Sequence, residues 1–288
     1  MTPHAPAPGR ALLQVALDLL REARSRKWFL ALGLGVTLLL VVLSLSLKLE
    51  VVDGALAASR LFGHLVGGHQ TIRSAGVALR PIFIAASYLT FYGGMIFGIL
   101  ACADFAPSLL SPGRIEHLLS LPVRRWELLG GTFLGVLVLA SVASLYGAGG
   151  LALILGVKTG VWTAMPLLAA LLTSICFATV YAAMLTTALF VRSAALSAGI
   201  GALVFVGGVI SSYRHDLDSM FEEGAGRTAF RGVTLIFPHL ASVADAAGRL
   251  AGSRAVEPME LARLLLGLGL FTLGALSVGA WRFEQRDF

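Results

Sequence analysis

The sequence predicts an all-α polytopic membrane protein with about six transmembrane helices, and three observations predict this class. First, 57% of the 288 residues are hydrophobic and only 13% are charged, whereas soluble chains have roughly 45–50% apolar and about 25% charged residues. Second, the mean hydropathy is +0.85. Third, six long stretches lack Asp, Glu, Lys and Arg, and each approaches the ~20 residues that span a bilayer as a helix.

We expect residues 1–288 to form a single transmembrane domain. Its predicted spans are 28–47, 81–102, 128–157, 160–191, 193–212 and 264–281. Short links at Lys158–Gly160 and Arg192–Ser193 predict tight turns around the fourth span. The first apolar run is longer than the ~7–15 residues of a signal-peptide core, so we expect it to remain as a membrane anchor.

Basic residues predict the orientation of the chain. Four of them lie between Arg21 and Lys27, just before the first span, and Arg124 and Arg125 precede the third span. The positive-inside rule then places both termini in the cytoplasm. The formal charge of +6 sits in short groups beside apolar runs, where anionic head groups attract it, so the expected partner is the lipid bilayer and not nucleic acid. We therefore predict a multi-pass protein of the plasma (bacterial inner) membrane.

The segment 11–24 predicts an amphipathic helix ahead of the first span. Gln14, Asp18, Arg21 and Glu22 recur at helical spacing among leucines and valines. One polar stripe on an otherwise apolar helix is typical of a helix that lies in the membrane interface. The alternative is an ordinary solvated helix packed on a partner.

The connection 103–127 predicts a short cytoplasmic helix between the second and third spans. Ser111 is a good N-cap, Pro112 suits the first helical position, and Pro122 ends the helix. On the opposite side, 213–263 is too long for a plain connection. We expect it to form a small extracytoplasmic cap of helices near the membrane surface, with a helix at His239–Leu250 and a contribution from the loop Lys48–Arg80.

Absent motifs exclude several functions. No Asp, Glu, Lys, Arg or His lies in the middle of a predicted span, which disfavours an ion-coupled pump. The sequence has no His-Glu-x-x-His, Gly-x-Ser-x-Gly or phosphate-binding Gly-x-x-x-x-Gly-Lys-Ser/Thr motif. Cys102 and Cys176 lie at or inside apolar runs and are interpreted as packing residues. We therefore predict no catalytic residues, no metal site and no cofactor bound by this chain, so any ATP must bind to another chain.

The segment 114–133 reads RIEHLLSLPVRRWELLGGTF and resembles the permease subunits of the type-2 ATP-binding-cassette exporters. The residues that match that family's pattern are Glu116, Leu118, Leu119, Pro122, Val123, Arg125, Glu127 and Gly130 or Gly131. Arg114 stands where the family often has Thr, and Thr132 where Lys commonly follows the Gly. The layout of an amphipathic helix, six spans and an elaborated segment before the last span is similar as well.

The resemblance implies that 112–121 is a coupling helix, which docks into a cytoplasmic ATPase dimer with help from the helix 11–24. The implied ATPase-coupling residues are Arg114, Ile115, Glu116, Leu118, Leu119, Pro122, Arg125 and Glu127. It also implies a second copy of this chain or a related permease, ATP and Mg²⁺ held by the ATPase, and a translocation path at the permease interface.

Neutral side chains are expected to line that path, which suits a lipidic or amphipathic substrate. The candidates are Tyr88, Phe91, Tyr92, Met95 and Phe205. Two alternatives stay open. The assembly could transmit force to an extracytoplasmic protein through 213–263 without transport, or the chain could be a channel or scaffold that needs no motor.

Overall fold

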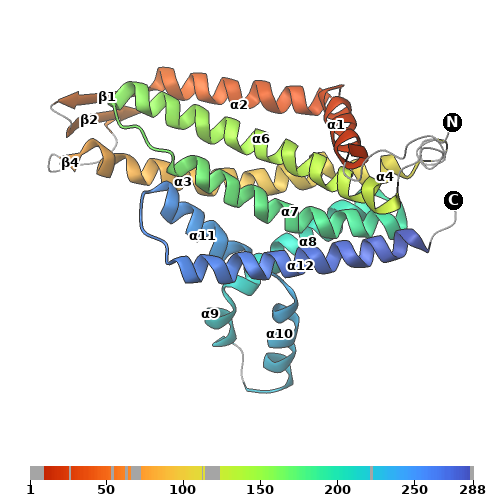
Figure 1. Ribbon diagram of the computed structural model, residues 1–288. Helices are drawn as coiled ribbons and strands as arrows, with labels where there is room; N and C mark the ends of the chain where they lie inside the picture. Colours follow the sequence, from red (N-terminus) through yellow and green to blue (C-terminus); the bar gives the residue numbers. More distant parts are fainter. Residues whose placement is uncertain are drawn as a thin grey trace.

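The computed structural model describes residues 10–25, 27–52, 55–61, 64–65, 73–111, 113, 124–220 and 223–285. Six helices are long and apolar enough to cross a membrane, as the sequence predicts. These helices are α2 (Lys27–Ser46), α3 (Ala75–Cys102), α6 (Arg125–Thr159), α7 (Met165–Val191), α8 (Ala194–Ser212) and α12 (Pro258–Glu284). They run side by side in one bundle, and α1 (Arg10–Ser25) and the end of α12 lie at the same end of it (Figure 1).

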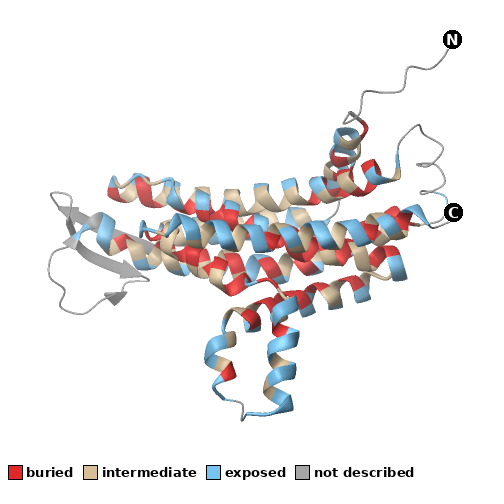
Figure 2. Cartoon of the chain, turned by 60° about the horizontal axis from the view of Figure 1, so that its bottom comes forward, coloured by how far each residue is buried: buried red, intermediate tan, exposed pale blue. Residues whose placement is uncertain are grey.

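The core of the bundle is α7. Within its most apolar stretch 78% of the residues are buried, against none in α2 and 6% in α12. Helices α3, α6, α8 and α12 surround α7, and buried residues concentrate where they face it (Figure 2). The apolar outer faces of α2 and α12 are left for lipid, as expected where hydrocarbon is the solvent.

The two tight turns that the sequence predicts are present. Gly160 ends α6 in the left-handed region with φ 72°, a conformation that glycine adopts without steric cost. Arg192 ends α7 with φ 52°, and the Ser193 hydroxyl then accepts a hydrogen bond from the Leu196 N–H at the start of α8. Helices α6, α7 and α8 therefore follow each other as close antiparallel neighbours.

The connection between α2 and α3 carries strands, which the sequence analysis did not foresee. β1 (Leu47–Val52) pairs antiparallel with β2 (Ala55–Leu61), which also pairs with β3 (His64–Leu65) and β4 (Arg73–Ser74). This small sheet stands at the end of the bundle opposite to α1 (Figure 1). It turns the chain from α2 back into α3.

The segment 213–263 differs from the expected surface cap. It forms α9 (Arg214–Asp218), α10 (Ala225–Ile236) and α11 (Leu240–Ala251), so a helix at 239–250 is confirmed. However, α11 packs against α3, α7 and α8 and buries eight of its residues inside the bundle. Close packing explains this position: a Cβ on Gly208 of α8 would lie 2.6 Å from the Leu240 side chain, and one on Gly252 would lie 2.8 Å from Ile84 of α3. Of these three helices, α9 and α10 project outward (Figure 1).

Candidate coupling end and translocation face

Helix α1 crosses the beginning of α6 at very short range. A Cβ built on Gly131 would lie 2.6 Å from Val15 Cβ and 2.8 Å from the Leu12 carbonyl oxygen, and one on Gly135 would lie 3.1 Å from the Ala16 carbonyl oxygen. Gly131 and Gly135 are four residues apart and form the small-xxx-small pattern that lets two helix backbones approach closely. A helix spans Arg10–Ser25, and its buried side, which includes Ala16 and Leu19, is fixed to α6 by this crossing.

Two side chains in its first turn fix the start of α6: Glu127 caps the helix, and Arg125 binds α12. The Glu127 carboxylate accepts a hydrogen bond from the Arg124 backbone N–H at 2.9 Å, which caps the helix in the manner of a capping box. The Arg125 guanidinium donates to the backbone oxygens of Phe283 and Glu284 at 2.9 and 3.0 Å. These oxygens are at the C-terminal end of α12, which favours a cation. Arg125 thus ties the first turn of α6 to the last turn of α12.

The other boundary of the coupling segment is α4 (Phe105–Leu109). Phe105, Ala106, Leu109 and Leu110 are buried, and the Phe105 ring packs on Phe29 of α2 with the centroids 5.9 Å apart. The described chain is therefore anchored on both sides of the segment 112–123, by α4 before it and by the start of α6 after it.

Most of the predicted coupling residues lie outside the described residues, namely Arg114, Ile115, Glu116, Leu118, Leu119 and Pro122. The two that are described serve the frame of the bundle. Glu127 is only 5% exposed, so it is placed to cap α6 and not to touch a partner, and Arg125 binds α12. Trp126 lies between them and is 43% exposed, although it was not among the predicted coupling residues.

The predicted path residues divide into two groups. Phe91 and Met95 of α3 are completely buried. They belong to the core, which corrects their assignment to a path wall. Tyr88 and Tyr92 are partly exposed and stack with their centroids 6.3 Å apart, while Phe205 of α8 meets Tyr92 edge to face at 6.2 Å. An aromatic face therefore runs along the contact of α3 and α8.

A carboxylate from α11, which is not a span, joins this face. The Tyr88 hydroxyl donates a hydrogen bond to Asp245 Oδ1 of α11 at 2.7 Å, and Tyr88 lies halfway along α3. One turn further along α11, Arg249 binds Glu260 of α12 at 2.6 Å, and this pairing raises the pKa of Arg249. The bundle thus holds an acidic group at the level of the middle of α3. Asp245 belongs to α11 and not to a span, so the prediction about the middle of the spans is not contradicted; nothing in the sequence indicated that α11 brings a carboxylate against α3.

No family model matches the chain. No curated protein matches it significantly either. Function therefore has to be inferred from the arrangement of its own residues. Within the described part of the chain, no group of three or more His, Cys, Asp or Glu side chains could hold a metal ion.

The projecting helices α9 and α10 are held together by one buried acid. Asp218 is 8% exposed and binds Arg227 at 2.8 Å and Arg231 at 2.5 and 2.8 Å. The Arg231 and Arg227 guanidinium groups hold the pKa of the Asp218 carboxyl well below its usual range. At the base of the hairpin, the Ser211 hydroxyl donates to the Thr234 carbonyl at 2.8 Å. The hairpin is therefore an ordered feature that presents its outer surface away from the bundle (Figure 2).

Proposed function

We propose that this chain is the membrane-spanning, non-catalytic subunit of an ATP-driven transporter whose ATPase is a separate polypeptide. The observation that supports it best is the anchored frame around the segment 112–123. Helix α1, the start of α6 and the end of α12 are joined by the glycine crossing and by Arg125. A push on a segment held by such a frame would move whole helices, because close-packed helices shift as rigid bodies.

The substrate path in this proposal runs along the partly exposed rings of Tyr88 and Tyr92, with the buried Phe205 ring packed against Tyr92, and is closed by a second copy of the chain or a related permease. Aromatic rings with one carboxylate suit an amphipathic molecule that offers both an apolar body and a polar group. In this arrangement both termini are cytoplasmic and the ATPase dimer binds ATP and Mg²⁺. The resemblance of 114–133 to type-2 ATP-binding-cassette permeases supports the same assignment.

Copurification tests the proposal. The tagged full chain, extracted from its own cells in mild detergent, should bring down an ATP-binding polypeptide. The double substitution Glu116→Ala and Leu119→Ala should remove that polypeptide while the chain stays inserted. Arg254→Ala, at the exposed opposite end of the bundle, is the matched control and should retain it. Absence of any ATP-binding polypeptide would favour a motor-independent channel or scaffold, and full retention by the double variant would exclude the coupling assignment.

The ordered hairpin α9–α10 favours a second candidate function, which is transmission of force to an extracytoplasmic protein. Its exposed apolar residues include Met220, Val233, Leu235 and Ile236, next to the arginine pair on Asp218. Uptake measurements in vesicles that contain the chain and its ATPase separate the two functions. ATP-dependent accumulation of a substrate supports transport, whereas ATP hydrolysis that depends on a hairpin-binding protein, without accumulation, supports force transmission.

A further inference from the structure

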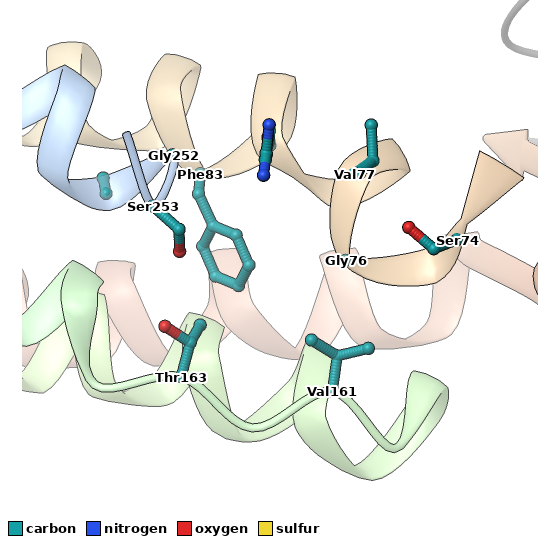
Figure 3. Close-up of a pocket in the computed structure, with 10 residues that line it drawn as sticks. Ser74, Gly76, Val77, Phe83, Val161, Thr163, Gly252 and Ser253 are labelled. Carbon is teal, nitrogen blue, oxygen red and sulfur yellow. The ribbon is translucent and has the colours of Figure 1, made fainter. Parts of the chain in front are cut away.

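A cavity of about 230 Å³ opens at the end of the bundle that carries the β-sheet. It lies between the first turns of α3, the link from α6 to α7, and the end of α11 (Figure 3). It has room for several water molecules. That volume suits the head of a lipid or a small anion and is below the ~300–1,000 Å³ of a typical drug-sized ligand site.

Among the described residues, the cavity holds one cation without a counter-ion. Arg80 lines it, and none of the ion pairs or hydrogen bonds among the described residues involves Arg80. Ser74, Thr163 and Ser253 add three hydroxyls from three different elements. A guanidinium with nearby hydroxyls supplies the donors that bind a phosphate. The first turn of α3 also lacks a side-chain cap, and its positive end favours the same charge.

The rest of the wall is apolar and continues onto the outside of the bundle. Val77, Phe83 and Val161 line the cavity, and Val77 is also 38% exposed. Trp162, between the cavity residues Val161 and Thr163, is 68% exposed, while its ring packs against the backbone at Gly156. An exposed Trp at the end of a span marks the level of the lipid head groups. The cavity therefore opens at the level of the bilayer where the phosphate of a lipid lies next to its glycerol and acyl chains.

We infer that this cavity binds the phosphate of an anionic phospholipid, with Arg80 as its charge partner and with Val77, Phe83 and Val161 in contact with the glycerol and upper acyl region. This site goes beyond the proposed transport function and does not depend on it. Because the cavity lies between α3 and α11, a lipid bound there would link α3, which carries Tyr88 and Tyr92, to α11, which carries Asp245.

Lipid titration of the purified full chain tests this inference. The thermal unfolding midpoint is followed as phosphatidylglycerol, phosphatidylcholine or inorganic phosphate is added, since a ligand of the folded state raises the midpoint as the site fills. Phosphatidylglycerol should raise it for the wild type. Arg80→Gln should bind about ten- to a hundredfold more weakly, because a charge-assisted bond is lost, and Arg80→Lys should recover part of the effect. Arg263→Gln, an exposed arginine of α12 outside the cavity, is the matched control.

Each outcome either supports or overturns the phosphate site. An Arg80-dependent effect of phosphatidylglycerol alone supports a lipid site, and an Arg80-dependent effect of inorganic phosphate supports the same phosphate chemistry with a free ion as its source. An equal response of wild type and Arg80→Gln, or an equal response to phosphatidylcholine, overturns the inference. If Arg80→Gln does not fold, Gly76→Leu replaces it, because a Cβ there meets only Val161 at 3.9 Å and a longer side chain would fill the cavity without changing charge.

Discussion

The glycine crossing between α1 and α6 leads to a quantitative prediction for Gly131→Ala. A methyl group there would lie 2.6 Å from Val15 Cβ and 2.8 Å from the Leu12 carbonyl oxygen, so the two backbones must separate by about 1 Å to reach ordinary contact. Overpacking of this kind costs about 1–3 kcal/mol, and the better helix propensity of alanine returns about 1 kcal/mol. We expect a net loss of up to about 2 kcal/mol in the docking of α1.

Trypsin cleavage within α1 measures this loss. A difference of 2 kcal/mol raises the undocked population up to about 30-fold, and cleavage after the exposed Arg21 and Arg24 should rise with it when opening is fast. The control is Gly147→Ala on the same helix, where the nearest atom to the new methyl, Val36 Cγ1, is 3.9 Å away. The variant Gly147→Ala gains the same helix propensity, and its new methyl group makes no steric clash. Cleavage of Gly131→Ala that is no faster than that of Gly147→Ala would refute the close crossing.

Three further predictions concern polar contacts. Pairing with Arg231 and Arg227 lowers the pKa of Asp218. The stabilisation of the hairpin by Asp218 is therefore complete above the unfolded pKa of about 3.9 and is lost as the pH falls through the folded pKa. Amide exchange of α10 should rise only in strong acid for the wild type, whereas Asp218→Asn should raise this exchange already at neutral pH. Tyr88→Phe should cost about 1–2 kcal/mol, since Asp245 loses its donor, and an unchanged denaturation midpoint would contradict that bond. Arg125→Gln should increase proteolysis at the end of α12, because the hydrogen bonds to the Phe283 and Glu284 backbone oxygens are lost. Cleavage at the wild-type rate would show that these bonds do not hold the end of α12.

The six spans could be predicted because a long uncharged run in lipid has few stable structures other than a transmembrane helix. The helix α11 could be predicted as well, but its buried position in the bundle could not. Its 12 residues are too few to cross a bilayer, and Asp245 and Arg249 give it the appearance of a surface helix. The signal that could have placed it is the row Ala241, Ala244, Ala247, Gly248 and Ala251, all of them buried, since small residues in such a pattern allow close helix contacts.

The candidate site could be predicted only in part, for a related reason. Tyr88 and Tyr92 are four residues apart on α3, and so are Phe91 and Met95, so all four lie on adjoining faces of one helix. Sequence spacing shows that each pair shares a face and does not show which face meets α7. Glu127 could have been recognised, because Arg124 and Glu127 have the spacing of a helix N-cap and its third residue.

The packing along α3 indicates how a push at the coupling end would reach the aromatic face. The second half of α3, which ends at Cys102, is packed closely on α7 and α8. A Cβ on Gly98 would lie 2.5 Å from the Phe177 ring, and one on Gly201 of α8 would lie 3.3 Å from Ile99. The other half of α3, up to Tyr88, is packed closely on α11 as well, because a Cβ on Gly252 would lie 2.8 Å from Ile84 and one on Gly248 would lie 3.2 Å from the Tyr88 ring. Tyr88 also donates a hydrogen bond to Asp245, and the first turns of α3 border the cavity. Close-packed interfaces resist sliding, whereas a helix end beside a cavity has room to move. Under the proposed function, α3 would therefore move together with α7, α8 and α11, and its first turns are where the packing leaves room for a change.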